Sequence, residues 1–411
     1  VDRTPADTMG PVAVRSARAV PLLGSGSAKA CVPDSPWTRS CLSGVRCCCA
    51  ALGRFFWGLV SGLVILVFVL RLGMFAIILL PAFLQVGYGY FCDRRVQRGI
   101  RFGPNSRNYL DVYCPREAME AREGRGSPVP VVVAVMGGAW MVGHRAWNAQ
   151  LGLRLMDAGV LVVAVDYRNF PFAHMPEMVE DVSNGLSWVF AHVADFGGDP
   201  GNVVVTGQSA GAHLLSLLLL QHCLAEVQGL ENGNCADADG GGWSLRDLRG
   251  FVGVSGAYDL PAVNAHLSTR WVSDSLLPLF CPEGDLAAWS PVQFLESAEW
   301  HAAGPGAAAR LPPTILFHGL KDRTVLPSST TTFAEALQDA GCGSVTKEMR
   351  PGLSHAEPII EGPFRGEDHQ VPLLLRVLLG ERSGERLESM PALRPIYPRY
   401  LIKIASFCMP F

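Results

Sequence analysis

The pentapeptide Gly207-Gln208-Ser209-Ala210-Gly211 constrains the fold of this chain more than any other stretch. Apolar runs at 202–206 and 212–220 flank it, and together they predict a buried strand, a tight turn and a helix. Ser209 then stands at the apex of the turn with a strained backbone. Glycine on either side removes the Cβ atoms that would clash where strand and helix approach closely. A serine presented in this way is typical of a nucleophile.

The rest of the sequence alternates between strand and helix patterns. Apolar, β-branched runs typical of strands buried on both faces occur at 129–135, 159–165, 202–206, 248–254 and 314–317. Helical patterns occur at 146–158, 178–194, 210–224 and 333–340. An antiparallel strand is expected at 106–114 and a short late strand at 344–349. This alternation predicts an α/β fold with a mostly parallel, doubly wound sheet flanked by helices.

Three segments without sustained periodicity are expected to be loops. They are a polar surface loop at 117–127, a Gly/Asn/Asp-rich insertion at 226–242 and a flexible loop at 300–309. The catalytic domain is expected to span 96–385. We expect the tail at 386–411 to pack on the domain or on a membrane.

The most apolar part of the chain runs from 55 to 91, with Arg71 as its only charged residue. As one helix it would extend about 55 Å, against a bilayer hydrocarbon core of about 30 Å. Two short spans fit this length, with a turn near Arg71 and a kink at Pro81. A single span with an interfacial helix, or a pair of buried core helices, is the alternative. We therefore expect a membrane-anchoring segment of one or two helices at 46–95, after a disordered tail at 1–45.

Composition narrows the classes of function. A net charge of −3 gives no electrostatic footprint for nucleic acid, so no nucleic-acid partner is expected. The twelve cysteines include no C-x-x-C pair, and no metal or cofactor is expected. Cys47, Cys48 and Cys49 lie just before the apolar segment, where they are either palmitoylation sites or a chance cluster. Arginines flank that segment on both sides, so both flanks prefer the cytosol.

A serine hydroxyl needs a base to act as a nucleophile at neutral pH. In α/β-hydrolases, whose nucleophile elbow reads G-x-S-x-G, the acid and then the histidine follow the serine along the chain. Asp322 follows the apolar run at 314–317, where the acid is expected. Of the ten histidines only His355 and His369 lie beyond it, and His369 falls in a charged stretch. We predict a triad of Ser209, Asp322 and His355.

The alternatives for the acid are a loop-capping role for Asp322, with Asp259, Asp274 or Asp285 in its place. In the predicted triad, Ser209 attacks an acyl carbonyl and His355 takes its proton and then gives it to the leaving alcohol. Asp322 holds the imidazole in the required tautomer.

The oxyanion of the tetrahedral intermediate needs preorganised donors. The backbone N–H of Ala210, directly after the nucleophile, is one candidate. Gly137 and Gly138 follow the first buried run and are the others, although a Gly-Gly pair is also an ordinary turn signal. Trp140 and Gln208 are candidate substrate contacts.

Four motifs together resemble those of the hormone-sensitive-lipase-like esterases, and more narrowly those of plant-type isoprenylcysteine α-carbonyl methylesterases. They are Gly137-Gly138-Ala139-Trp140, Asp166-Tyr167-Arg168-Asn169-Phe170-Pro171, Gly197-Gly198-Asp199-Pro200 and Gly207-Gln208-Ser209-Ala210-Gly211-Ala212-His213. The stretch at 98–113 and the tail at 394–411 also resemble that family. The resemblance extends from about residue 55 to the end of the sequence given.

The resemblance implies hydrolysis of the methyl ester on a prenylated C-terminal cysteine. Prenylcysteine methyl esters are the implied substrates and prenylated proteins further ones, at endoplasmic reticulum and Golgi membranes with a cytosolic catalytic domain. A prenyl chain partitions into a bilayer, where a membrane-anchored hydrolase and the membrane lipid would meet it. Candidate lid contacts, which also fit an ordinary core, are Trp271, Leu276, Leu277, Leu279 and Phe280.

One position departs from this family, which usually has histidine where this chain has Met136. The family's histidine is thought to brace the oxyanion loop, and methionine cannot donate a hydrogen bond. Because the backbone donors remain, we expect a less rigid loop rather than lost activity.

Two other functions fit the same motifs. One is a membrane-anchored carboxylesterase or formamidase with another substrate. The other is a non-catalytic receptor of the gibberellin-receptor kind, although such proteins tend to lose a triad member and this chain has all three candidates.

Overall fold

The computed structural model describes residues 63, 66–67, 69–229, 242–270, 272–304 and 306–408. All of them belong to the compact unit Val60–Phe411. The predictions for the tail at 1–45, for Cys47–Cys49 and for Trp271 therefore lie outside the described residues, as do most of the insertion at 226–242 and the beginning of the apolar segment.

An eight-stranded sheet forms the centre of this unit. The sequence predicted a mostly parallel sheet, but not the strand at Val96–Arg101. Its strands are β1 Val96–Arg101, β2 Tyr109–Tyr113, β3 Val129–Val135, β4 Leu161–Val165, β5 Gly198–Gln208, β6 Leu248–Val254, β7 Thr314–Gly319 and β8 Val345–Arg350. Their spatial order is β1-β2-β4-β3-β5-β6-β7-β8. β2 is antiparallel to β1 and to β4, and the strands from β4 to β8 are parallel. The carboxyl ends of the parallel strands therefore meet at one edge.

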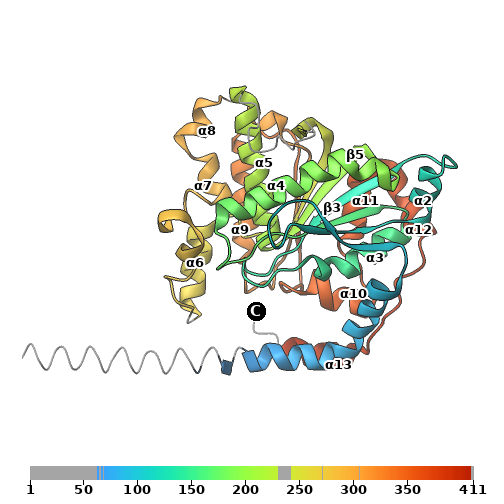
Figure 1. The fold of residues 1–411 in the computed structure, drawn as a ribbon. Coiled ribbons are helices and arrows are strands. Elements are labelled where there is room, and N and C mark those ends of the chain that lie inside the picture. Colours follow the sequence, from blue (N-terminus) through green and yellow to red (C-terminus); the bar gives the residue numbers. More distant parts are fainter. Residues whose placement is uncertain are drawn as a thin grey trace, which may run out of the picture. The chain divides into compact units, whose positions relative to one another are not determined.

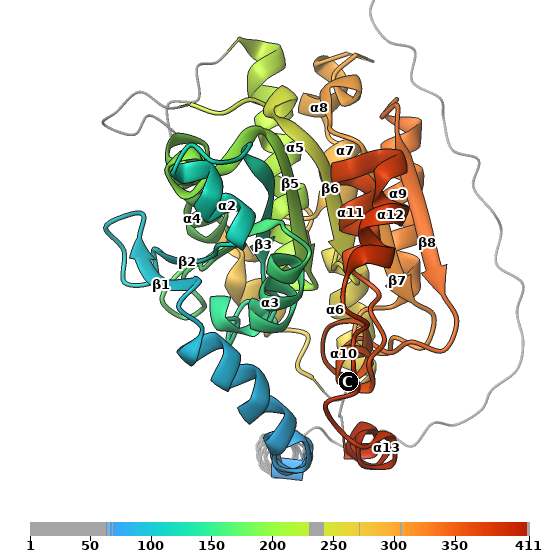
Figure 2. The same cartoon turned by 90° about the vertical axis from the view of Figure 1, so that its right-hand side faces the viewer.

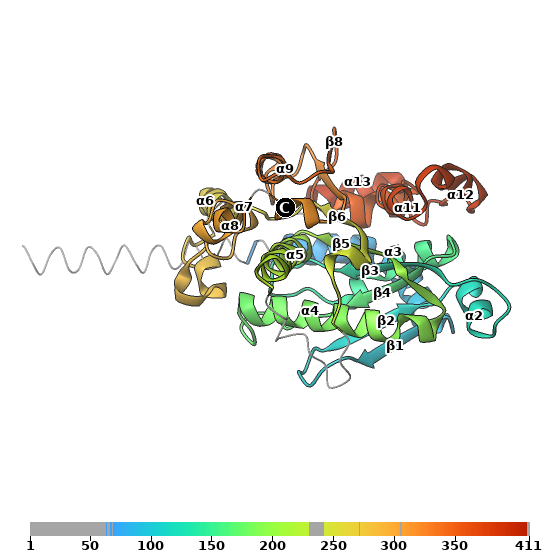
Figure 3. The same cartoon turned by 90° about the horizontal axis from the view of Figure 1, so that it is seen from above.

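Helices cover both faces of the sheet (Figures 1 and 3). Val131 and Val133 of β3 point into a core shared with α4 Met175–His192, α5 Ala210–Gln228 and α9 Pro327–Asp339. Val132 and Ala134 point into a core shared with α3 Ala149–Asp157, α11 Val371–Leu379 and α12 Ser383–Ser389. Since both faces are buried, each strand reads as a continuous apolar run rather than an alternating one. The remaining helices of this domain include α6 Leu260–Thr269, α7 Pro291–Leu295 and α10 Gly362–Arg365.

Two expected loops are short helices instead. The surface loop at 117–127 contains α2 Arg116–Arg122, and the loop at 300–309 contains the end of α8 Ala298–Ala302 and a 3₁₀ turn, Ala308–Arg310. Each helix is anchored by one buried side chain, Ala118 in α2 and Trp300 in α8. One buried position is too few to produce a readable period, so the sequence pattern missed them.

A helix at Val69–Cys92 precedes the sheet and is long and apolar enough to cross a membrane. Only 17% of its most apolar stretch is buried. α5 is also long and apolar enough to cross a membrane, but 78% of its most apolar stretch is buried, and it belongs to the core. The helix continues through Arg71, so the expected turn at that residue is wrong. Arg71 Nη2 instead donates to the carbonyl oxygen of Phe407, 2.9 Å away. Figure 2 shows the helix bending partway along, and Pro81, which lacks an N–H, explains such a bend.

The C-terminal helix α13, Arg399–Cys408, packs beside this helix (Figures 1 and 2). Ile402 and Ala405 of α13 are buried in a cluster that also contains Phe75 and Leu79 of the Val69–Cys92 helix. Phe364 of α10 belongs to the same cluster and joins both helices to the catalytic domain. α13 thus packs against the Val69–Cys92 helix and against Phe364.

A substitution at Gly185 tests how tightly α4 packs against the sheet. A Cβ atom at this position would overlap Cγ1 of Val165, a stiff, buried, β-branched side chain. We expect Gly185→Ala to lower the free energy of unfolding by about 1–3 kcal/mol in spite of alanine's better helix propensity.

The matched control is Gly384→Ala in α12, where a Cβ atom meets nothing within 4 Å. It should stabilise the protein by up to about 1 kcal/mol. Thermal or denaturant unfolding of the detergent-solubilised variants measures both. Equal effects of the two substitutions would contradict the packing described.

Candidate active site

Ser209 occupies the turn between β5 and α5. Its backbone has φ 51° and ψ −118°, a strained conformation for a residue with a side chain. The N–H of Ser209 donates to the carbonyl oxygen of Val254 at 2.9 Å, which ties the turn to β6. A Cβ atom on Gly211 would overlap the carbonyl oxygen of Val135, and one on Gly207 would lie 2.6 Å from the nitrogen of Ala212. The two glycines are therefore required by close backbone approaches.

Asp322 and His355 meet at the same edge of the sheet. Asp322 Oδ2 lies 2.6 Å from His355 Nδ1. The other carboxylate oxygen, Oδ1, accepts the backbone N–H groups of Thr324 at 2.8 Å and Val325 at 3.0 Å. Asp322 is 3% exposed, so its own loop fixes both the position and the direction of the carboxylate.

A second histidine contacts the same carboxylate, and the sequence analysis did not assign it a role. His318, the fifth residue of β7, places Nε2 3.0 Å from Asp322 Oδ2. Its Nδ1 lies 2.7 Å from Thr330 Oγ1. The sequence could have indicated this contact, because His318 lies at the end of a buried strand and only four residues before Asp322.

These partners keep Asp322 ionised. Burial by itself would raise the pKa of this carboxyl group. The charge of His355 and the hydrogen bonds from His318 and His355 outweigh that effect, and they hold the pKa of Asp322 well below its usual range. An ionised carboxylate only accepts hydrogen bonds, so both histidines donate to it.

This donation fixes the tautomer of neutral His355. With Nδ1–H directed at Asp322, Nε2 carries the lone pair that a general base needs. The hydrogen bond to Nε2 comes from the side-chain amide of Gln208, whose nitrogen is 3.2 Å away. Between Ser209 Oγ and His355, both described, the structure gives no hydrogen bond. It is therefore Gln208, the residue before Ser209, that contacts Nε2 of His355. The catalytic roles of Ser209, Asp322 and His355 stay a prediction.

The predicted oxyanion loop lies beside Ser209. A Cβ atom on Gly137 would be 2.9 Å from Ser209 Cβ. Neither Gly137 nor Gly138 donates its N–H to another described residue. Ala210 is the first residue of α5, so its N–H has no acceptor within the helix. Three donors are therefore available near Ser209, although their role as an oxyanion hole stays a prediction.

Side chains brace this loop at its far end. The carbonyl oxygen of Gly143 accepts from Arg107 Nη2 at 2.6 Å and from Asn169 Nδ2 at 3.0 Å. Arg107 also pairs with the buried Asp166 at 2.6 Å. The Asp166–Pro171 motif thus supplies two of the residues that hold the loop. Met136, at the beginning of the loop, is buried and makes no polar contact. The side chains that hold the loop contact it at Gly143 instead.

Trp140 is a second brace. It is 4% exposed, and its indole N–H donates to His213 Nδ1 at 3.2 Å. An indole N–H only donates, so His213 carries its proton on Nε2, which donates to the carbonyl oxygen of Trp289 at 2.7 Å. Burial lowers the pKa of His213 to about 4, so it is neutral near pH 7. The polar atom of Trp140 is used within the protein, and its substrate contact stays a prediction.

The alternative triad candidates lie elsewhere. His369 is half-buried and contacts the ring of Phe317, so it is less solvated than its charged surroundings suggested. Asp259 accepts from the N–H of Ala262 as the N-cap of α6. Asp285 accepts from backbone N–H groups of its own turn. Among the proposed lid residues, Leu277 and Phe280 are core and Leu279 is exposed.

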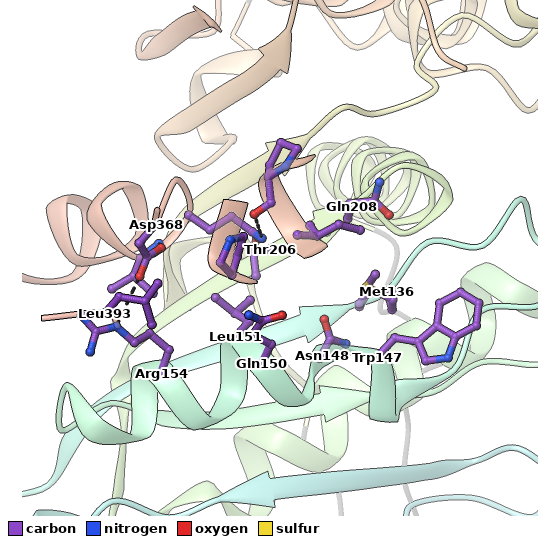
Figure 4. Close-up of a pocket in the computed structure, with 17 residues that line it drawn as sticks. Met136, Trp147, Asn148, Gln150, Leu151, Arg154, Thr206, Gln208, Asp368 and Leu393 are labelled. Carbon is purple, nitrogen blue, oxygen red and sulfur yellow. Dashed lines mark hydrogen bonds and ion pairs between the residues drawn. The ribbon is translucent and has the colours of Figure 1, made fainter. Parts of the chain in front are cut away.

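A pocket borders the site on the α3 and α11 side of the sheet (Figure 4). Met136 and Gln208 line one end of it, and Arg154 and Asp368 line the other. Leu151 and Ile359 contribute apolar walls. In the described part of the chain, no group of three or more His, Cys, Asp or Glu side chains is placed to hold a metal ion.

The BD-FAE family matches residues 110–337 of this chain. The isoprenylcysteine alpha-carbonyl methylesterase ICME of Arabidopsis thaliana is 34% identical over 346 residues, which are 83% of this chain and 76% of that protein. This chain belongs to the isoprenylcysteine alpha-carbonyl methylesterase family. The esterase LipQ of Mycobacterium tuberculosis is 28% identical, covering 72% of this chain and 66% of LipQ. Esterase 2 of Thermogutta terrifontis, in its apo form, is 22% identical with a TM-score of 0.46, covering 64% of this chain and 86% of that one.

Membership of this methylesterase family, together with the sheet order, shows that the protein has an α/β-hydrolase fold and is a carboxylic ester hydrolase. The predicted resemblance and fold class are confirmed.

The Trp140–His213 brace predicts a pH dependence of stability. Unfolded histidine titrates near 6.5, whereas buried His213 titrates near 4, so the unfolded state binds more protons between these values. Its contribution is complete above pH 6.5 and is lost as the pH falls towards 4. At about 1.4 kcal/mol per pKa unit, the free energy of unfolding should fall by about 3 kcal/mol over this window.

Denaturant unfolding between pH 7 and pH 4 measures this dependence. The variant His213→Gln cannot be protonated, so it should be less stable at pH 7 but should change less with pH than the parent protein. Parallel curves for the two proteins would show that His213 does not titrate as described.

Proposed function

We propose that this protein is a serine esterase that removes the methyl ester from isoprenylcysteine. Ser209 is the nucleophile, His355 the general base and Asp322 the acid that orients it. The observation that carries the proposal is the 2.6 Å contact of Asp322 with His355, beside the elbow that presents Ser209. Membership of the methylesterase family supports the choice of substrate.

In the first half-reaction Ser209 Oγ forms a bond to the carbonyl carbon of the ester, and its proton passes to His355 Nε2. The carbonyl oxygen becomes an oxyanion held by the N–H groups of Gly137, Gly138 and Ala210, each of which would contribute about 3 kcal/mol. The bond to the methoxy group then breaks, and the proton on His355 leaves with it as methanol.

In the second half-reaction water replaces the alcohol. His355 takes a proton from water, and the hydroxide attacks the acyl carbon through the same oxyanion. The bond to Ser209 Oγ breaks and the proton on His355 returns to that oxygen. Prenylcysteine leaves as the carboxylic acid, which releases its proton to solvent. Asp322 stays ionised throughout and stabilises the imidazolium that forms twice in the cycle.

We further propose that the enzyme acts at endoplasmic reticulum and Golgi membranes, with its catalytic domain in the cytosol. The helix Val69–Cys92, whose length of about 36 Å exceeds a hydrocarbon core of about 30 Å, supports an anchor. Arg94, Arg95, Arg98 and Arg101 follow it, which favours the cytosolic side for the domain. A prenylated substrate and membrane lipid would then share one surface, and prenylated proteins would be further substrates.

The outer face of α13 supports a location at a membrane surface. Tyr400, Ile404 and Phe407 recur at helical spacing and are 67%, 49% and 76% exposed. Exposed Arg399 and Lys403 stand beside them. Aromatic and basic side chains on one helix are typical of elements that lie in the headgroup region of a bilayer.

Ser209→Ala should abolish hydrolysis of a prenylcysteine methyl ester and labelling by a fluorophosphonate probe, because both need the hydroxyl. The assay measures release of prenylcysteine by the detergent-solubilised full chain, with short p-nitrophenyl esters in parallel. Turnover of the short esters alone would favour a carboxylesterase of other specificity. An intact protein that is not labelled would favour the non-catalytic receptor.

The triple variant Tyr400→Ser, Ile404→Ser and Phe407→Ser should lose activity on the ester embedded in phospholipid vesicles, by about tenfold or more, since about 0.8 kcal/mol is lost per buried methylene group. Its activity on a water-soluble short ester should not change. The control is Met119→Ser, which removes an exposed apolar side chain from α2. An equal loss on both esters would mean that α13 is needed for folding rather than for the membrane.

A further inference from the structure

One hydrogen-bonded chain runs through the site and determines where each proton sits. Ionised Asp322 accepts from His318 Nε2 and from His355 Nδ1. Nε2 of His318 also faces the carbonyl oxygen of Val325 at 3.0 Å, and in the neutral ring Nδ1 then accepts from the hydroxyl of Thr330 at 2.7 Å. In the same way His355 Nε2 accepts from the amide of Gln208, at 3.2 Å. The atom that must take a proton from Ser209 is therefore already bonded to another donor.

We propose that Gln208 is a latch on the catalytic base: its amide holds His355 Nε2 and must move before Ser209 can use that atom. This inference rests on the proposed function of Ser209 and His355. Gln208 acts through His355, so it is a positioning residue. While engaged, it keeps His355 in the tautomer that catalysis needs, and it competes with the serine hydroxyl for the same lone pair.

The position of Gln208 makes it suited to this role. It is the last residue of β5, directly before Ser209, and is 6% exposed. A Cβ atom on Gly137 would lie 2.5 Å from Gln208 Oε1. The amide therefore spans the gap between the oxyanion loop and the imidazole of His355. A substrate carbonyl that reaches the N–H groups of this loop approaches the oxygen end of the amide directly.

The structure also offers the side chain somewhere to go. Gln208 lines the pocket beneath the site, next to Met136, and Thr206 and Asn148 line the same pocket (Figure 4). Thr206 and Asn148 hydrogen-bond to backbone carbonyl groups of β6 and β3. A glutamine that leaves His355 thus enters a partly polar space, so its release does not require an amide to be buried among apolar groups alone.

The test compares Gln208→Met with the parent protein. Methionine has a similar shape but no N–H, so the lone pair on His355 becomes free. We expect the second-order rate constant for labelling of Ser209 by a fluorophosphonate probe to rise about two- to tenfold, the range of one ordinary hydrogen bond. Gln150→Met is the matched control, because Gln150 lines the same pocket from α3, and its labelling rate should not change.

A second variant tests the contact itself. Gln208→Glu places a carboxylate beside His355, whose other partners are Asp322 and, through it, His318. The added negative charge favours imidazolium, so the acidic limb of the kcat/KM profile should move to higher pH. The short p-nitrophenyl ester is the substrate, and a melting temperature close to that of the parent protein shows that each variant is folded.

The outcomes separate the latch from the proposed function. Labelling of Gln208→Met that is unchanged or slower would overturn the latch, since the amide would then be neutral or helpful. An acidic limb that stays in place in Gln208→Glu would overturn it as well. If the parent protein itself is not labelled, or if Ser209→Ala is labelled as strongly, the proposed function fails instead.

Discussion

The site depends on one buried carboxylate that is fully hydrogen-bonded. Asp322 is taken out of water, which costs several kcal/mol unless donors replace the lost hydration. Two backbone N–H groups and two imidazoles do so. The orientation of His355 follows from this arrangement, and so does the direction of its lone pair. Without His318 the carboxylate would lose one donor in a buried place, so this fully buried histidine belongs to the site.

The same reasoning shows which parts were predictable from the sequence. Ser209 was, because its strand, glycines and helix are adjacent in the chain, and the sheet was, because a strand buried on both faces reads as an apolar run. The triad candidates followed from chain order. The contact of Gln208 with His355 joins residues 147 apart, and the contact of Trp140 with His213 joins residues 73 apart. Such pairs leave no local pattern, so only the folded chain reveals them.

The errors have local causes. α2 and α8 each bury one residue, which a periodic signal cannot register. Arg71 was expected near a turn because one straight helix over the whole apolar segment would be longer than a bilayer core. Its guanidinium reaches a carbonyl group of α13 instead, and a helix distant in sequence thus allows the segment to remain continuous. Met136 makes no polar contact, and Arg107 and Asn169 hold the loop at Gly143 instead.

The loop from Gly137 to Gly143 has a wider consequence. Ala139 and Trp140 have φ of 49° and 58°, and this unfavourable backbone is maintained by side chains from distant elements. A loop supported in this way can relax while the cooperative core of the sheet remains intact. Damage to one support would then leave a protein that melts normally and binds its ester, yet turns it over slowly. Screens that rank variants by thermal shift alone would pass over such defects.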